Sequence, residues 1–256
     1  VAEEKLKALK GQLVTLNRPD NVGSFSPSQE LLNSLLEHYQ SGRHNDAEKV
    51  AIAITRDFPQ HPFAWKVLGA LFGQSNRQVE AVNANQRAVS LSPQDAAAHN
   101  NLGNTLKELG RFEEAEASYI QAITLKPNFI EAHSNLGVTL QELGRFEEAE
   151  ASYNQAIALK PDYAEVHSNL GNTLKELGRL EEAEASYKQA IALKPDYADP
   201  LNNLGNTLQL QGRLAEAKTS YKQAIALKPD LAEAHNGLGV LLKSLGSLDE
   251  AEASQR

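Results

Sequence analysis

The sequence repeats a unit of 34 residues, and this period constrains the fold more than any other feature. Six prolines mark it by recurring at the same interval: Pro59, Pro93, Pro127, Pro161, Pro195 and Pro229. A fixed period of this length is typical of an array of stacked units, in which each unit buries its apolar face against its neighbours. The 256 residues therefore count repeats and need not share one hydrophobic core.

The copy that spans residues 164–197 shows how one unit is built. Apolar and small residues fall at helical spacing in both halves, in the first half at Leu170, Gly171 and Leu174, and in the second at Ala183, Tyr187 and Ala190. Each half is therefore predicted to form a helix, and the two apolar faces must meet. We expect the backbones to approach most closely between Gly171 and Ala183, with Tyr187 filling the space beside them.

Turn-forming residues mark the ends of the two helices. Gly178 stands where the first helix should stop, because glycine adopts the left-handed conformation at the C′ position without a steric cost. Pro195 ends the second helix. Asp196, with Asp199 three residues later, is predicted to cap the first helix of the next copy.

This pattern resembles the tetratricopeptide repeat in its period and in its Leu-Gly, Ala, Tyr, Ala and Pro positions. The resemblance covers residues 28–256, and at least four full copies lie between Ala96 and Leu231. It implies an all-α fold, a right-handed α-solenoid of antiparallel helix pairs. It also implies that the first helix of each pair lines a concave groove that binds peptides or proteins.

The copies divide the chain into four segments. Residues 1–25 have leucines at helical spacing followed by a turn-rich stretch, which predicts a short or frayed helix and a linker. Residues 26–95 hold two divergent copies, the first starting with Ser26 as N-cap and Pro27 at the first helical position. Residues 96–231 hold four near-identical copies, and residues 232–256 begin a fifth. Leu35 replaces the usual glycine and Asn85 the usual tyrosine in the divergent copies, which predicts different packing there.

Charge and composition argue against several classes of function. The chain carries 25 basic and 33 acidic side chains, and its net charge of −8 belongs entirely to residues 96–256. An acidic array argues against a general nucleic-acid or anionic-membrane surface. The sequence has no cysteine, no long apolar run and no signal-peptide core, so we expect a cytoplasmic protein. Because it starts at Val1, contains no methionine and stops within a copy, we interpret it as a fragment.

Asparagine recurs at the sixth position of the near-identical copies, on the helix that the resemblance places along the groove. These residues are Asn101, Asn135, Asn169 and Asn203. A carboxamide both donates and accepts hydrogen bonds, so such a ladder can hold an extended peptide by its backbone. The alternative is that each asparagine satisfies neighbouring backbone groups or faces water. We favour the ladder, because a polar residue of low helix propensity that recurs inside a helix needs a reason.

Two further positions flank this ladder. Position nine holds Asn104, Val138, Asn172, Asn206 and Val240, and position twelve holds Lys107, Gln141, Lys175, Gln209 and Lys243. The candidate peptide-binding groove includes the asparagines and lysines of both positions. Position two is acidic in four copies, whereas related proteins that clamp a C-terminal carboxylate place lysine or arginine there. This argues against that mode of binding.

The stretch from His167 to Arg179 narrows the resemblance. It is similar to repeats in the superhelical domain of O-linked N-acetylglucosamine transferases, in which an asparagine ladder binds substrate polypeptides. Many bacterial repeat proteins share the same consensus. The similarity therefore concerns the ladder-bearing type of repeat, and the catalytic domain of those enzymes is absent from these residues.

Histidines and glutamates recur too, and neither set predicts a reaction. Position four holds His99, His133, His167 and His235. Equivalent helices of successive copies should lie ~8–10 Å or more apart, whereas nitrogens that share a zinc ion each lie ~2 Å from it, so we expect structural histidines. The Glu-Glu-Ala-Glu runs, such as Glu181, Glu182 and Glu184, predict a solvated helix face. The sequence has no phosphate loop, dinucleotide fingerprint or hydrolase motif, so we expect no catalytic residue, metal or cofactor.

These observations predict a non-catalytic scaffold for protein–protein interaction that holds an extended polypeptide in its groove. The second hypothesis is the substrate-recognition arm of a larger glycosyltransferase, similar to the O-linked N-acetylglucosamine transferases, or of another modifying enzyme with its catalytic domain outside this chain. The third is self-association through apolar surface in the last copy, such as Leu245 and Leu248.

Overall fold

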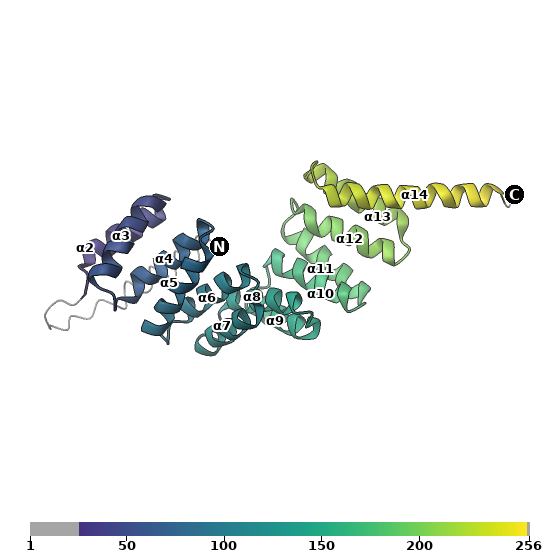
Figure 1. Ribbon diagram of the computed structural model, residues 1–256. Helices are drawn as coiled ribbons and strands as arrows, with labels where there is room; N and C mark the ends of the chain where they lie inside the picture. The colour runs from purple at the N-terminus through teal and green to yellow at the C-terminus, as the bar shows by residue number, and fades with distance from the viewer. Residues whose placement is uncertain (1–25, 255–256) are drawn as a thin grey trace. The chain divides into compact units, whose positions relative to one another are not determined.

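The computed structural model describes the backbone of residues 26–254 and the side chains of residues 26–246. The predicted helix and linker in residues 1–25, and the side chain of Leu248, lie outside the described residues. The described part of the chain is helical throughout apart from turns and contains no strand (Figure 1). Contacts divide the chain into two compact units, Val1–Pro127 and Asn128–Arg256.

The described part of the first unit, from residue 26 onward, contains three helix pairs. Its helices are α2 (Gln29–Gln40), α3 (His44–Asp57), α4 (Pro62–Gln74), α5 (Gln78–Leu91), α6 (Ala96–Glu108) and α7 (Phe112–Leu125). Each helix contacts the next along the chain, and α4 also contacts α6 (Figure 1).

The second unit continues the same alternation. Its helices are α8 (Ile130–Glu142), α9 (Phe146–Leu159), α10 (Ala164–Glu176), α11 (Leu180–Leu193), α12 (Ala198–Leu210), α13 (Leu214–Leu227) and α14 (Ala232–Ser254). Here too each helix packs on its neighbour, and the first helices of successive copies, α8, α10, α12 and α14, also contact one another in that order. The prediction of an all-α array of helix pairs is confirmed.

A buried tyrosine ring fills the space between the two helices of each near-identical copy. The rings of Tyr119, Tyr153, Tyr187 and Tyr221 are all fully buried. A Cβ atom placed on Gly171 would lie 2.6 Å from Cε1 of Tyr187, much closer than carbon atoms pack. The expectation that Tyr187 fills the space beside Gly171 is confirmed. The glycine leaves room for the tyrosine ring of the second helix.

The divergent copies show the same junction with other side chains. In the first copy Leu35 and Ala51 occupy the two equivalent positions and both are fully buried, so the large residue has moved to the first helix. In the second copy the amide of Asn85 lies against Gly69 and donates to Oγ1 of Thr105 at 2.8 Å. The packing therefore differs at both positions. In the first copy the large side chain, Leu35, lies on the first helix, and in the second copy the amide of Asn85 replaces the tyrosine ring.

The turn after the first helix forms as the sequence predicts. Gly178 has a φ of +73°, and the N–H of Arg179 donates to the carbonyl of Leu174 at 2.9 Å. The second divergent copy has Asn76 at the equivalent position with a φ of +59°. Asparagine tolerates this left-handed conformation better than other side chains, so the turn is retained without glycine.

Both predicted N-caps are wrong in position. Helix α2 is capped by Ser28, whose Oγ accepts from the N–H of Leu31 at 3.3 Å, and Ser26 lies before the helix. The N-cap of α12 is Tyr197, which makes no side-chain cap, because Asp196 lies one residue too early. Asp95 shows the correct position, since its Oδ1 accepts from the N–H groups of Ala97 and Ala98 at 3.0 and 3.3 Å.

Helix α14 differs from the other first helices because it continues through Gly246. In the copy before it, the residue after the turn glycine is Arg213, which holds Glu216 in the first turn of the second helix. The fifth copy has Ser247 at that position, so it has no equivalent ion pair to fix the turn. Leu245 is half-buried and packs against the core of the second unit.

Candidate functional site

The predicted ladder asparagines of the second unit lie at matching points of α8, α10 and α12. Asn135, Asn169 and Asn203 are all half-buried. Their backbone carbonyls accept hydrogen bonds from the hydroxyls of Thr139, Thr173 and Thr207, at 2.9, 3.1 and 2.9 Å. In each of these copies a threonine four residues further along therefore contacts the helix backbone at the asparagine.

Asn172 at position nine is the centre of a polar contact between two copies. Its Oδ1 accepts from the hydroxyl of Tyr187 at 2.8 Å and from Nδ2 of Asn203 at 2.9 Å. One of the predicted ladder residues, Asn203, thus uses its side-chain N–H group for a hydrogen bond that links α12 to α10. Both acceptor sites of the Asn172 oxygen are occupied, and its orientation is fixed.

The other position-nine amides share the tyrosine contact. The hydroxyl of Tyr221 donates to Oδ1 of Asn206 at 2.7 Å, and that of Tyr119 in the first unit donates to Oδ1 of Asn104 at 2.8 Å. Where position nine is Val138, the hydroxyl of Tyr153 instead donates to Oε1 of Gln141. The amide oxygens of Asn104, Asn172 and Asn206 therefore face the buried rings, which fixes the orientation of each carboxamide.

Three amides have donors that are not used within the described part of the chain. Nδ2 of Asn172 and Nδ2 of Asn206 make no hydrogen bond there, and the side chain of Asn169 makes none at all. Asn169 lacks the contact that Asn203 makes because the preceding copy has Val138 in place of an asparagine. None of the three amides is fully buried. They can therefore bind an acceptor that approaches from solvent.

The remaining candidate residues are distributed over both units. In the first unit Asn101, Asn104 and Lys107 are half-buried on α6. In the second unit Lys175 is half-buried, with Nζ 3.3 Å from Oε1 of Glu176, and Lys243 is exposed. Most of the candidate residues lie in the second unit, where α8, α10, α12 and α14 contact in succession.

The recurrent histidines hold the connections between copies. Nε2 of His99, His167 and His235 lies 2.9–3.0 Å from the carbonyl oxygen of Pro93, Pro161 and Pro229, respectively. A carbonyl only accepts, so Nε2 carries the proton. Trp65 makes the same contact at the same position, with Nε1 donating to the carbonyl of Pro59 at 3.0 Å. The described residues contain no group of three or more side chains able to hold a metal ion.

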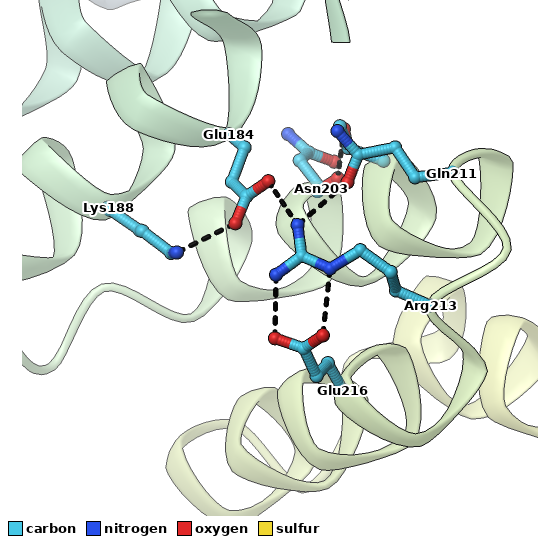
Figure 2. A network of polar contacts seen from close by, with 7 residues as sticks. Glu184, Lys188, Asn203, Gln211, Arg213 and Glu216 are labelled. Atoms are coloured by element: carbon cyan, nitrogen blue, oxygen red, sulfur yellow. Dashed lines mark hydrogen bonds and ion pairs between the residues drawn. The ribbon is translucent and has the colours of Figure 1, made fainter. Parts of the chain in front are cut away.

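Arg213, at the start of α13, links this helix to α11 of the preceding copy (Figure 2). Arg213 donates to Glu216 through Nε and Nη2 at 2.7 Å each, and through Nη1 to Glu184 at 2.5 Å. Nζ of Lys188 also donates to Glu184 at 2.7 Å. Burial alone would raise the pKa of Glu184, but the hydrogen bonds from Lys188 and Arg213 outweigh it and lower the pKa.

The expectation of a solvated face is therefore wrong for Glu184, which is only 8% exposed, whereas Glu181 is exposed as predicted. Arg77 with Glu48 and Arg179 with Glu150 repeat the contact between copies, each at 2.6 Å. The signal in the sequence is an arginine that follows a glutamate by 29 residues. These contacts stabilise the array and offer no reactive group.

Within the described residues, no helix is both long and apolar enough to cross a bilayer. The half-buried amides on the first helices of the second unit remain the candidate site.

Comparison with known proteins identifies the family of this chain. Residues 28–256 match the family model of the cilia and flagella-associated protein 70 C-terminal domain, a tetratricopeptide repeat model. No curated protein sequence matches the chain.

Three solved structures illustrate the likeness of fold. PilW, a type IV pilus biogenesis factor, is 22% identical with a TM-score of 0.74, over 83% of this chain and all of its own. YrrB, a tetratricopeptide repeat protein with an unusual peptide-binding site, is 20% identical with a TM-score of 0.62, over 74% of this chain and 98% of its own. A thermophilic tetratricopeptide repeat protein of Thermus thermophilus, TTC0263, is 25% identical with a TM-score of 0.57, over 71% of this chain and 99% of its own.

Proposed function

Because the chain belongs to the tetratricopeptide repeat family of the cilia and flagella-associated protein 70 C-terminal domain, we propose that it is a non-catalytic scaffold for protein–protein interaction. Its second unit binds an extended polypeptide across the first helices α8, α10, α12 and α14. The contacts are hydrogen bonds from asparagine amides to the backbone of the bound segment.

The observation that carries this proposal is the set of unused amide donors at Asn169, Asn172 and Asn206. Each lies on a first helix, and two of them are held in one orientation by a buried tyrosine hydroxyl. A donor that is already oriented loses little conformational freedom when it binds, which favours affinity. Two of these donors lie on α10 and one lies on α12, so they suit an extended chain that crosses both helices and presents its backbone carbonyls to them.

This view modifies the ladder predicted from position six. Asn203 contributes one donor to the contact between copies, so it is in part structural, whereas Asn169 is free to bind. The position-nine amides of Asn172 and Asn206 join Asn169 as the main contacts. The peptide-binding site of YrrB shows that a protein with this fold can bind a peptide, and it supports the class of partner alone.

The proposal is tested by selecting peptides from a random library displayed on phage against the chain of residues 1–256. The affinity of a selected peptide is then measured for wild type, for Asn169→Ala and for the matched control Asn154→Ala. Asn154 is an exposed asparagine on α9, a second helix of the array. We expect Asn169→Ala to weaken binding about threefold to tenfold, as the loss of one net hydrogen bond does. The proposal is wrong if only the Asn154 variant loses affinity.

Absence of catalysis is part of the same proposal. No observation on this chain favours the alternative of a glycosyltransferase arm over a scaffold. Incubation of the chain with sugar-nucleotide donors and acceptor peptides is expected to give no product above background. Turnover that survives repurification would show that the chain contains a catalytic centre.

A further inference from the structure

Position nine of the second unit changes character along the array. The four residues there are Val138 on α8, Asn172 on α10, Asn206 on α12 and Val240 on α14. Two amides are thus flanked on both sides by a valine. Since these helices contact in succession, the four side chains form one row within the unit.

The flanking valines present apolar surface at the two ends of the row. Val240, on α14, is 53% exposed. Val138 is half-buried and packs against the core of the unit on one side. In other copies an asparagine at this position accepts from the tyrosine hydroxyl. In this copy the hydroxyl of Tyr153 donates to Gln141, so Val138 does not leave that hydroxyl without a partner. Both positions are therefore able to contact an apolar side chain from solvent.

The length of this row determines how many residues of an extended polypeptide it can contact. Three steps between neighbouring helices separate Val138 from Val240, and each step is ~8–10 Å. An extended chain advances ~3.3 Å per residue, so the row spans about seven to nine residues. Side chains of an extended segment alternate between two faces, and only an even separation directs both end residues at the row. A separation of about eight residues satisfies both conditions.

We propose that the row recognises an extended polypeptide with two apolar side chains about eight residues apart, one against Val138 and the other against Val240. The intervening backbone lies on the amides of Asn172 and Asn206. This inference rests on the proposed function and adds to it the sequence preference of the partner. The amides supply affinity without regard to sequence, and the valines select the segment.

The test uses fluorescein-labelled synthetic peptides of about twelve residues in a serine–glutamine background. One peptide carries leucines eight residues apart, a second carries them five residues apart, and a third carries none. Anisotropy titrations should show the first peptide binding wild type at least tenfold more tightly than the other two, because burying a leucine side chain is worth about one order of magnitude or more.

Two variants connect the preference to the row. Val138→Asn and Val240→Asn introduce the residue that other copies already hold at position nine, and circular dichroism should show unchanged helix content. Each variant should reduce the affinity for the first peptide about tenfold, and the affinity for the leucine-free peptide should not fall, because the added amide can only supply a further hydrogen bond to the backbone.

The outcomes separate this inference from the proposed function. Equal affinity of wild type for all three peptides, with a loss in Asn169→Ala, would overturn the valine selection and leave the scaffold intact. The same preference for eight-residue spacing in both valine variants would also overturn it. Binding of no peptide, together with an empty phage selection, would instead refute the proposed function.

Discussion

The contact between Gly171 and Tyr187 provides a quantitative test of the packing. An added Cβ at Gly171 would lie 2.6, 2.8 and 2.9 Å from Cε1, Cδ1 and Cζ of the ring. The ring is fully buried and its hydroxyl is bonded to Asn172, so it has no free direction in which to move. Overpacking of this kind costs ~1–3 kcal/mol, and alanine recovers ~1 kcal/mol through its better helix propensity. We expect Gly171→Ala to lower the free energy of unfolding by up to about 2 kcal/mol.

Gly239 is the matched control in the same unit. It lies within α14, and a Cβ added there meets nothing within 4 Å. Gly239→Ala should therefore gain up to ~1 kcal/mol from propensity alone. Urea unfolding followed by circular dichroism measures both variants on one scale. If Gly171→Ala were as stable as Gly239→Ala, the ring would not be packed against the glycine.

A size exchange extends this test. The first copy has Leu35 and Ala51 where the copy of residues 164–197 has Gly171 and Tyr187, and both Leu35 and Ala51 are fully buried. Gly171→Leu and Tyr187→Ala should each destabilise the chain by several kcal/mol, because ~1–3 kcal/mol is usual for overpacking and ~3–5 kcal/mol for removing a buried aromatic side chain. The double variant should lose about 0.5–3 kcal/mol less than the sum, as residues in contact do. Strict additivity would contradict the exchange.

Three further predictions concern charge. Glu150→Val should lower the urea midpoint slightly, because it removes the partner of Arg179 in the contact between copies. Asp95→Asn keeps an N-cap for α6 but removes the charge that lies 2.9 Å from the buried Nζ of Lys66, and should cost ~3–5 kcal/mol in urea unfolding. Burial, with the nearby Glu176, raises the pKa of Tyr187 above its unfolded value of ~10. The contribution of Tyr187 to the free energy of unfolding should therefore be fully present below that pH and should fall as the pH rises beyond it. Tyr187→Phe should reduce this pH dependence, measured as the urea midpoint against pH.

The fold could be predicted from the sequence because its signals are local and repeated. The period, the turn glycine at Gly178 and the alternation of small and large apolar residues each act within one unit. The sequence does not show how closely the ring packs on the small residue, since only the packed helices place atoms of Tyr187 directly against Gly171. The N-caps were misplaced by one or two residues because several polar residues precede each helix.

The candidate site was predicted in part, for a different physical reason. The sequence indicates that position six is polar although asparagine has a low helix propensity. It does not show that Asn203 donates a hydrogen bond to Asn172 in the preceding copy. Nor does it show that tyrosine hydroxyls orient the amides at position nine. Contacts between copies depend on how neighbouring helices are offset. A residue such as Glu184, polar in the sequence and buried in the structure, is recognised only when residues 29 apart are compared.

The most direct test of the account is the nuclear magnetic resonance spectrum of the asparagine side-chain amides during titration with a selected peptide. The Nδ2 signals of Asn169, Asn172 and Asn206 are assigned by single substitution, and Asn154 serves as the internal reference on a second helix. The account predicts that the three signals shift together and saturate at the Kd measured by anisotropy, while the Asn154 signal stays in place. Saturable binding that shifts Asn154 and leaves the other three amides unchanged would contradict the placement of the site on the first helices.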